Sequence, residues 1–211
     1  SYRVLPFEGL APRGGSYWLH LEGDSTLLRG EKEELIWLMS AVAVAANASR
    51  ALGRPVREVL EQHAADHELG DEAAYWVCAY ANNQHKLASD ITADPKDSAF
   101  FKAMELSEGV LVVMDSKAIV FTRIWCGFEQ ATAVRHAKLL LDFATVHRGK
   151  AQLLTQGLAY ETEATQMKAA RERGFPLELM EHGYTTIDIT KAEATKKEDK
   201  RHILNSIAGR E

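Results

Sequence analysis

The chain has 211 residues, of which 46% are hydrophobic and 26% charged, so it is long enough for one core and has the composition of an ordinary globular protein. Its formal net charge of −5 at pH 7 argues against general nucleic-acid binding, because proteins of that class present a basic surface. The Lys/Arg-rich piece at residues 191–201 is interleaved with Glu and Asp, which favours a solvated helix face over a phosphate-binding track.

Cellular location is indicated by cysteine content, the chain start and hydropathy. The two cysteines, Cys78 and Cys126, lie within elements that we expect to be buried, which suits a reducing compartment. No secretory signal is visible, and the chain begins with Ser1 rather than Met, so we expect a trimmed or processed start. The longest apolar run, residues 35–46, falls short of the roughly 20 residues that span a bilayer. We therefore expect an intracellular, cytoplasmic protein without a membrane span.

Residues 1–53 are expected to form an irregular N-terminal extension. Glycines and prolines are frequent over residues 1–30 and indicate turns, with one short strand at residues 17–21. From residue 31 to residue 52 the pattern is Ala-rich and helical, and Gly53 ends that helix.

From residue 54 onward, strands and helices alternate. We expect strands at residues 74–81, 109–115, 139–146, 151–156 and 185–189, and helices at residues 56–69, 98–106, 121–134, 161–173, 177–182 and 192–208. Such alternation is typical of a parallel sheet with helices on both faces. The sequence therefore predicts that residues 54–211 form an α/β domain with a three-layer, flavodoxin-like parallel sheet.

The stretch Phe121–Glu129 is the centre of this domain. It follows the apolar strand at residues 109–115 after a short loop at residues 116–120. Its apolar stripe, which we expect to pack on the sheet, consists of Phe121, Ile124, Trp125 and Phe128. Because the loop and the first turns of such a helix lie at the carboxyl edge of the sheet, where open α/β folds hold ligands, we expect Glu129 near that edge.

Several signals for other chemistries are absent from the sequence or weak. It contains neither a Gly-rich phosphate loop nor the Gly-x-Ser-x-Gly elbow of α/β-hydrolases. His63 and His67 form the only i,i+4 pair of histidines, but no third ligand is nearby in the sequence. We therefore interpret this pair as a solvated face of a charged helix and expect no metal site.

Three motifs together resemble a known family. They are Tyr75-Trp76-Val77-Cys78-Ala79-Tyr80-Ala81-Asn82-Asn83-Gln84-His85, the helix signature Arg123-Ile124-Trp125-Cys126-Gly127-Phe128-Glu129, and the tail Ile187-Asp188-Ile189 followed by Ala192-Glu193-Ala194-Thr195. Residues 54–208 resemble a Toll/interleukin-receptor (TIR) type domain, and more closely a TIR-like group of proteins from algal protists, dinoflagellates especially. One departure is that the usual opening strand, which reads like Phe-Val-Ser-His, does not stand before Gly53.

The resemblance implies a signalling function. In enzymatic TIR domains the glutamate of this helix is catalytic in cleaving NAD between nicotinamide and ribose, and that role would fall on Glu129. The chemistry suits a carboxylate, because breaking the bond develops positive charge on the ribose that a carboxylate stabilises. NAD would be a substrate, and no other cofactor is implied. A second hypothesis is a non-catalytic TIR-like module that binds itself or other protein chains, or serves as a structural subunit of a larger assembly.

The resemblance also suggests residues that would bind NAD beside Glu129. They are Asn83, Gln84, Ser116, Trp125 and Cys126. Several of these residues have simpler interpretations. Asn83 and Gln84 suit a turn, and Trp125 suits a hydrophobic core. Cys126 has no basic partner beside it in the sequence to make it a nucleophile, and Glu129 could be a solvent-facing helix residue.

Overall fold

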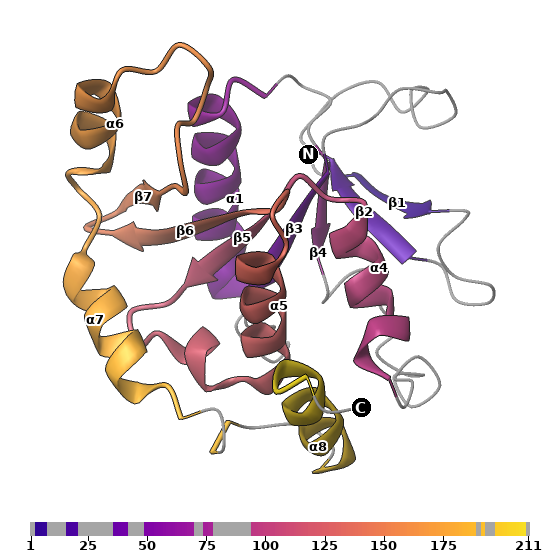
Figure 1. Cartoon of the computed structure of the whole chain (residues 1–211). Coiled ribbons are helices and arrows are strands. Elements are labelled where there is room, and N and C mark those ends of the chain that lie inside the picture. Colours follow the sequence, from indigo (N-terminus) through magenta and orange to yellow (C-terminus); the bar gives the residue numbers. More distant parts are fainter. Residues whose placement is uncertain are drawn as a thin grey trace.

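A seven-stranded mixed sheet runs through the protein, with the strand order β1-β2-β4-β3-β5-β6-β7 (Figure 1). The structure is a computed structural model, and it describes residues 3–7, 16–20, 36–41, 49–69, 74–77, 94–188, 191–192 and 197–209. The strands are β1 (Arg3–Phe7), β2 (Ser16–His20), β3 (Ile36–Ala41), β4 (Ala74–Val77), β5 (Gly109–Met114), β6 (Leu140–His147) and β7 (Lys150–Leu154). The helices are α1 (Ser49–Asp66), α4 (Ala99–Glu105), α5 (Ile124–Arg135), α6 (Thr165–Glu172), α7 (Leu177–Thr186) and α8 (Lys197–Ile207), with short 3-10 helices η2 (Pro95–Asp97) and η3 (Ile119–Thr122).

The predicted α/β class is confirmed, but the sheet is not wholly parallel. The four adjacent strands β4, β3, β5 and β6 are parallel to one another, whereas β2 pairs antiparallel with β4, β1 with β2, and β7 with β6. Strand β7 runs antiparallel to β6 because the connection between the two strands is short. Only Arg148 and Gly149 join β6 to β7, and both have positive φ, as in a two-residue hairpin turn. A parallel crossover would need a dozen or more residues.

Both faces of the sheet are covered, which explains the continuous apolar sequence of β5. Val110 and Val112 pack in a cluster with Cys126 of α5, whereas Leu111 packs in a second cluster with Leu60 of α1. Successive strand residues point to opposite faces, so α5 and α1 lie on opposite sides of the sheet. Figure 1 shows α5 in front of the sheet and α1 behind β6 and β7.

The predicted orientation of the central helix is wrong. Ile124 and Phe128 of α5 pack with Ile203 of α8, and Trp125 lies against that same cluster. The residues of α5 that pack with the strands are the smaller Cys126 and Ala133. Small side chains let a helix approach a sheet closely, and Ile124, Trp125 and Phe128 then lie against a second helix. Phe121, the fourth residue of the predicted stripe, lies in η3 and does pack with strand residues.

Two of the predicted elements are also wrong. Residues 36–41, expected to be helical, form β3, which lies between β4 and β5 in the middle of the sheet. A run of about a dozen apolar residues fits either a buried helix or a buried central strand, and pairing on both sides decides for the strand. Residues 185–186, expected in a strand, end helix α7, and residues 187–188 form no strand.

The sheet takes strands from both sides of the expected boundary at residue 53. Strands β1, β2 and β3 come from the segment 1–53, and β3 pairs with β4 and β5 from the segment 54–211. The short strand predicted at residues 17–21 is confirmed as β2. Among the described residues, no helix is long and apolar enough to cross a bilayer.

Candidate functional site

Glu129 lies in α5 on the side that faces the sheet. It follows Cys126 by three residues and precedes Ala133 by four, and both of these pack with strand residues. Residues at such spacings share one side of a helix. The Glu129 residue is only 2% exposed, so the alternative of a solvent-facing helix position is wrong. A carboxylate is rarely buried to this extent unless it is paired or used.

The segment between β5 and α5 fixes where the helix begins. Asp115 accepts a hydrogen bond from the backbone N–H of Ile119 at 2.9 Å, and the Thr122 hydroxyl donates to the Ile119 carbonyl at 2.8 Å. Ala118, in the left-handed region at φ 52°, turns the chain between them. Glu129 is the sixth residue of α5, so it lies about 7.5 Å along the axis from the start of the helix at the carboxyl edge of β5.

The other predicted site residues are only partly brought together. Cys126 is buried on the same side of α5 as Glu129. Trp125 is half-buried against the cluster of Ile124 and Phe128, and its ring meets the Phe128 ring edge-on with the centroids 5.9 Å apart. Ser116 is exposed in the loop after β5. The predicted Asn83 and Gln84 lie outside the described residues.

A second cluster of functional side chains lies on the opposite face of the sheet. His63 and His67 project from the last turns of α1 toward β6, and the Asp142 side chain of β6 contacts both rings. The Nε2 atoms of His63 and His67 lie 3.3 Å and 2.6 Å from the same oxygen, Oδ2 of Asp142. The His63 and Asp142 side chains are fully buried. The prediction of a solvated histidine pair is therefore wrong, because the pair faces the sheet rather than water.

Two further groups hold this cluster in place. The Tyr75 hydroxyl of β4 lies 2.8 Å from Nδ1 of His63, and the backbone N–H of Gln156 donates to Oδ1 of Asp142 at 2.9 Å. Both oxygens of the carboxylate and both nitrogens of the His63 ring therefore have partners. Buried polar side chains are expected to be satisfied in this way.

Burial and hydrogen bonding set the charges in the cluster. Burial lowers the pKa of His63 and outweighs the opposing hydrogen bond to Asp142, so this ring is neutral. Burial alone would raise the pKa of Asp142, but hydrogen bonds with His63 and His67 bring it below its usual value, so the carboxylate is ionised. Burial also raises the pKa of Tyr75, which keeps the hydroxyl protonated. The Tyr75 hydroxyl then donates to Nδ1 of His63, and Nε2–H of the neutral ring points at Asp142.

Next to this cluster, a charged network joins α6 to the end of β7. Lys168 donates to Thr155 and to Glu172, and the Glu172 carboxylate also accepts from the Thr155 backbone N–H at 2.8 Å. Arg171 forms two parallel hydrogen bonds of 2.9 Å to Glu163. These bonds lower the pKa of Glu163, so an ionised carboxylate faces the Arg171 guanidinium.

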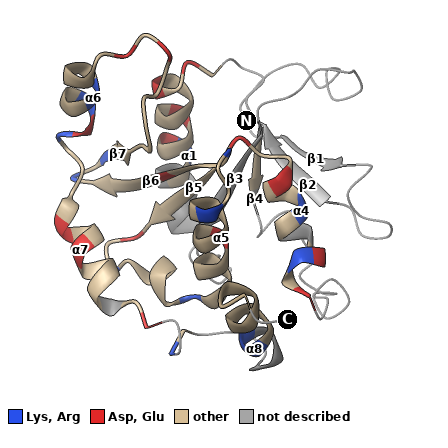
Figure 2. Ribbon diagram, in the orientation of Figure 1, with Lys and Arg blue, Asp and Glu red and all other residues tan. Residues whose placement is uncertain are grey.

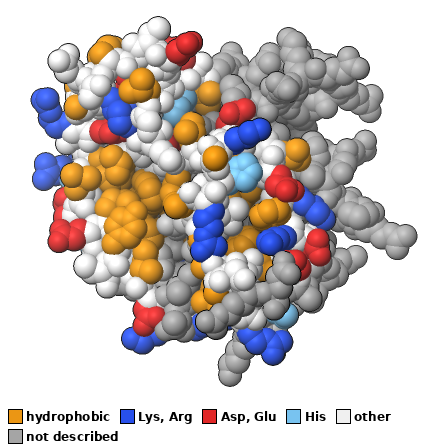
Figure 3. All heavy atoms as spheres, viewed as in Figure 1, with side chains coloured by type: hydrophobic (Ala, Val, Ile, Leu, Met, Phe, Trp, Pro, Cys, Tyr) orange, Lys and Arg blue, Asp and Glu red, His pale blue; other side chains and the backbone are white. Residues whose placement is uncertain are grey.

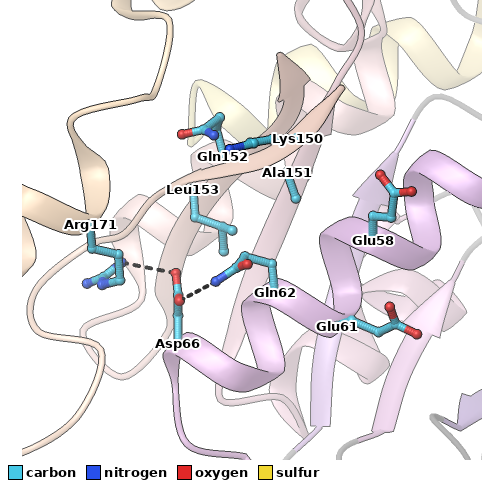
Figure 4. A pocket seen from close by; sticks show the side chains of 9 residues that line it. All are labelled: Glu58, Glu61, Gln62, Asp66, Lys150, Ala151, Gln152, Leu153 and Arg171. Atoms are coloured by element: carbon cyan, nitrogen blue, oxygen red, sulfur yellow. Dashed lines mark hydrogen bonds and ion pairs between the residues drawn. The ribbon is translucent and has the colours of Figure 1, made fainter. Parts of the chain in front are cut away.

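The network extends to α1 across a surface hollow of about 630 Å³ between α1 and β7. Figure 4 shows the Asp66 carboxylate at the side of this hollow, between the Gln62 amide and the Arg171 guanidinium. The Gln62 amide donates to Asp66 at 2.7 Å, and the Arg171 contact is 3.5 Å. The hollow carries both acidic and basic groups, and Figure 2 likewise shows Lys and Arg mixed with Asp and Glu over several described elements.

The two clusters are separate sites. Glu129 is the sixth of the twelve residues of α5, which packs on one face of the sheet, whereas Asp142 is the third residue of β6 and Tyr75 the second of β4. The histidine cluster is therefore near the amino ends of the strands and on the other face of the sheet. In the sequence, the spacing of His63 and His67 on a helix pointed to the histidine cluster. The second signal, which sequence reasoning did not use, was Asp142, an isolated acidic residue within an apolar strand.

Comparison with known proteins finds no relative of this chain: no family model, curated protein or solved structure matches it.

Proposed function

We propose that the protein is a TIR-like domain that hydrolyses NAD at the bond between nicotinamide and ribose, with Glu129 as the catalytic residue. The observation that carries this proposal is the burial of Glu129, 2% exposed, on the sheet-facing side of the helix that follows β5. A carboxylate in that position is protected from water, where its charge acts more strongly on a bound cationic centre.

The order of the parallel strands supports a flavodoxin-like, three-layer arrangement. Taken in chain order, β3, β4, β5 and β6 are the first to fourth parallel strands, and in space they are ordered second, first, third, fourth. This is the order of the first four strands of the flavodoxin-like sheet. In that order the ligand lies at the carboxyl edge between the first and third strands, here β3 and β5. Helix α5 contacts both of these strands.

The position of β3 also answers the departure in the sequence. TIR-like domains open with a strand that contributes to the nucleotide pocket, and no such strand was expected before Gly53. β3 is the first parallel strand in chain order and lies next to β5. The fifth position is the main difference, because β7 pairs antiparallel with β6 rather than continuing the parallel sheet.

In the proposed reaction, nicotinamide leaves with the electron pair of the glycosidic bond, and positive charge develops on the ribose. Glu129 would stabilise that charge and orient the ribose hydroxyls, and water would then complete the hydrolysis. Nicotinamide is cationic in NAD and leaves as a neutral molecule, so no strong general acid is needed. One buried carboxylate therefore suffices for the chemistry.

The test is the substitution Glu129→Gln, which keeps nearly the same volume and removes the charge. Release of nicotinamide from NAD by the purified protein should fall by roughly a hundredfold or more, the usual loss for one electrostatic stabiliser, with the melting temperature little changed. Glu178→Gln, at an exposed position of α7, is the matched control and should leave the rate unchanged. Equal rates for the wild type and Glu129→Gln would remove Glu129 from the mechanism.

The second candidate function is association with another copy of the chain or another protein, and exposed apolar residues of one helix favour it. Leu177, Tyr184 and Ile187 are 63%, 57% and 43% exposed. Spaced seven and three residues apart, they follow one stripe along α7 and its C-terminal end, named here the α7 stripe. Figure 3 shows hydrophobic side chains gathered on the face of the molecule that carries α7. Such a surface is typical of an interaction site.

A further inference from the structure

The cluster of His63, His67 and Asp142 has the donor atoms of a metal site. One nitrogen from each histidine and one oxygen of Asp142 lie within 4.8 Å of one another. The two histidines are four residues apart on α1, so both rings leave the same side of the helix. Both present Nε2 to a single oxygen of the carboxylate. A structural hydrogen bond to Asp142 would need only one of these rings.

The distances are close to those that a tetrahedral ion requires. With metal–ligand bonds of about 2.1 Å, the ligand atoms around zinc lie about 3.4 Å apart. The distance from His63 Nε2 to Asp142 Oδ2 is 3.3 Å and needs no change. The distance from His67 Nε2 to the same oxygen is 2.6 Å and would open by about 0.8 Å, which a small side-chain rotation supplies.

The groups around the ligands are those that orient metal ligands elsewhere. A metal-bound histidine donates the N–H of its second ring nitrogen to a fixed acceptor. A metal-bound carboxylate accepts a hydrogen bond on the oxygen that does not bind the metal. Binding an ion through Nε2 of His63 moves the ring proton to Nδ1, and this Nδ1–H then donates to the Tyr75 hydroxyl, 2.8 Å away. The backbone N–H of Gln156 donates to Oδ1 of Asp142. These contacts leave Nε2 of His63 and Oδ2 of Asp142 directed at the same point.

We propose that His63, His67 and Asp142 bind one divalent transition-metal ion of the zinc class, which fastens the end of α1 to β6. Two imidazole nitrogens and one carboxylate favour zinc-like ions over Mg²⁺ and Ca²⁺, which prefer oxygen ligands throughout. A water molecule completes the four-coordinate shell. The His67 side chain is 5% exposed, and the ion enters from its side. This site is independent of the proposed reaction at Glu129, which lies on the other face of the sheet.

The experiment is a titration of the purified, chelator-treated chain with ZnCl₂ by isothermal titration calorimetry. We expect one equivalent of zinc to bind and the melting temperature to rise with zinc concentration, because an ion that binds only the folded chain stabilises it. His67→Gln should weaken binding by at least tenfold while the far-ultraviolet circular dichroism stays the same. Tyr75→Phe, which keeps the ring and removes the hydroxyl, should weaken binding by about 10- to 100-fold.

The matched control is His136→Gln, which removes an exposed histidine outside the cluster. It should bind zinc as the wild type does. Zinc binding that persists in His67→Gln and disappears in His136→Gln would place the ion elsewhere and overturn the proposal. A wild type that binds zinc no more tightly than His67→Gln would also overturn it, and the cluster would then be a hydrogen-bonded group only.

A measurement on the wild type keeps the proposal testable if His67→Gln does not fold. Nitrogen-15 spectra of the eight histidine rings report which ring nitrogens bind the ion. One equivalent of zinc should shift the Nε2 resonances of two rings, and these two should be the rings in contact with each other, His63 and His67, whose centroids lie 4.5 Å apart. Shifts in other rings, or in none, would contradict the proposed site.

Discussion

Three buried acidic residues of this protein have different surroundings, and those surroundings assign them different roles. Asp142 is held by two histidine rings and a backbone N–H, and it is proposed as a metal ligand. Glu163 forms a bidentate ion pair with Arg171, which is a structural arrangement. Glu129 is buried on the sheet-facing side of α5, and it is proposed as the catalytic residue.

The Glu163 carboxylate should make the stability of the fold depend on acid. Its pKa is lowered first by the hydrogen bonds from Arg171, and the backbone N–H of Ala159 adds to this. A lowered pKa means that the pair stabilises the fold fully above the usual value of 4.5 and loses that contribution as the pH falls through the lowered pKa. Glu163→Gln should therefore be less stable than the wild type at pH 7, and the difference should shrink below about pH 4.

Urea unfolding of both proteins from pH 7 to pH 3 measures this difference. Glu161→Gln, an exposed position two residues earlier, is the control and should track the wild type at every pH. A Glu163→Gln variant whose deficit stays constant over the whole pH range would show that the loss is one of packing and not of charge.

Helix α7 packs against η3 through a close approach at Gly183. A Cβ atom at this position would collide with the ring of Phe121. That ring has little room to move, because it is buried and stacked on Phe143 with centroids 6.3 Å apart. The glycine is therefore required by packing rather than by backbone conformation.

Gly183→Ala should lower stability by about 1–3 kcal/mol, the usual cost of overpacking a core. This is a reversal of sign, because the same change in an unhindered helix adds roughly 1 kcal/mol. Thermal unfolding measures it, with Glu181→Ala at an exposed position of the same helix as the control. Adding Phe121→Leu to Gly183→Ala should recover part of the loss. A more stable Gly183→Ala would show that α7 does not lie against Phe121.

An element could be predicted from the sequence when its residue pattern is compatible with few alternative structures. The strand at residues 109–115 was recognised because a short apolar run after a helix and a polar turn has few alternatives, and β5 matches it. The run at residues 35–46 is long enough for a helix, and only its pairing with β4 and β5 makes it a strand. The direction of β7 depended on a turn of two residues, Arg148 and Gly149, which was within reach of sequence analysis.

The two candidate sites also differ in how far each could be predicted from the sequence. Glu129 was singled out because its motif is local, although its burial against the sheet could not be read from the amphipathic pattern. The histidine cluster could not be predicted, because Asp142 follows His67 by 75 residues. Only the packing of α1 across β6 brings the ligands together, and no local pattern reports that packing.

The α7 stripe should mediate association of the whole molecule. Replacing Leu177 and Ile187 together by Ser removes two exposed apolar side chains of the stripe and keeps Tyr184, whose ring lies 5.6 Å from that of the buried Phe121. Sedimentation velocity should show that the wild type associates as its concentration rises and that the double variant does so less. Val134→Ser, at another exposed apolar position on α5, is the control and should associate like the wild type. Identical behaviour of all three would exclude the stripe as the interface.

The most direct test of the proposed function is proton NMR of NAD incubated with the wild-type protein over a range of protein concentrations. We expect nicotinamide and ADP-ribose to accumulate in equal amounts, at a rate that Glu129→Gln reduces by roughly a hundredfold or more. NAD that stays intact at every concentration, including those at which the protein associates, would contradict the enzyme and leave the interaction module as the function.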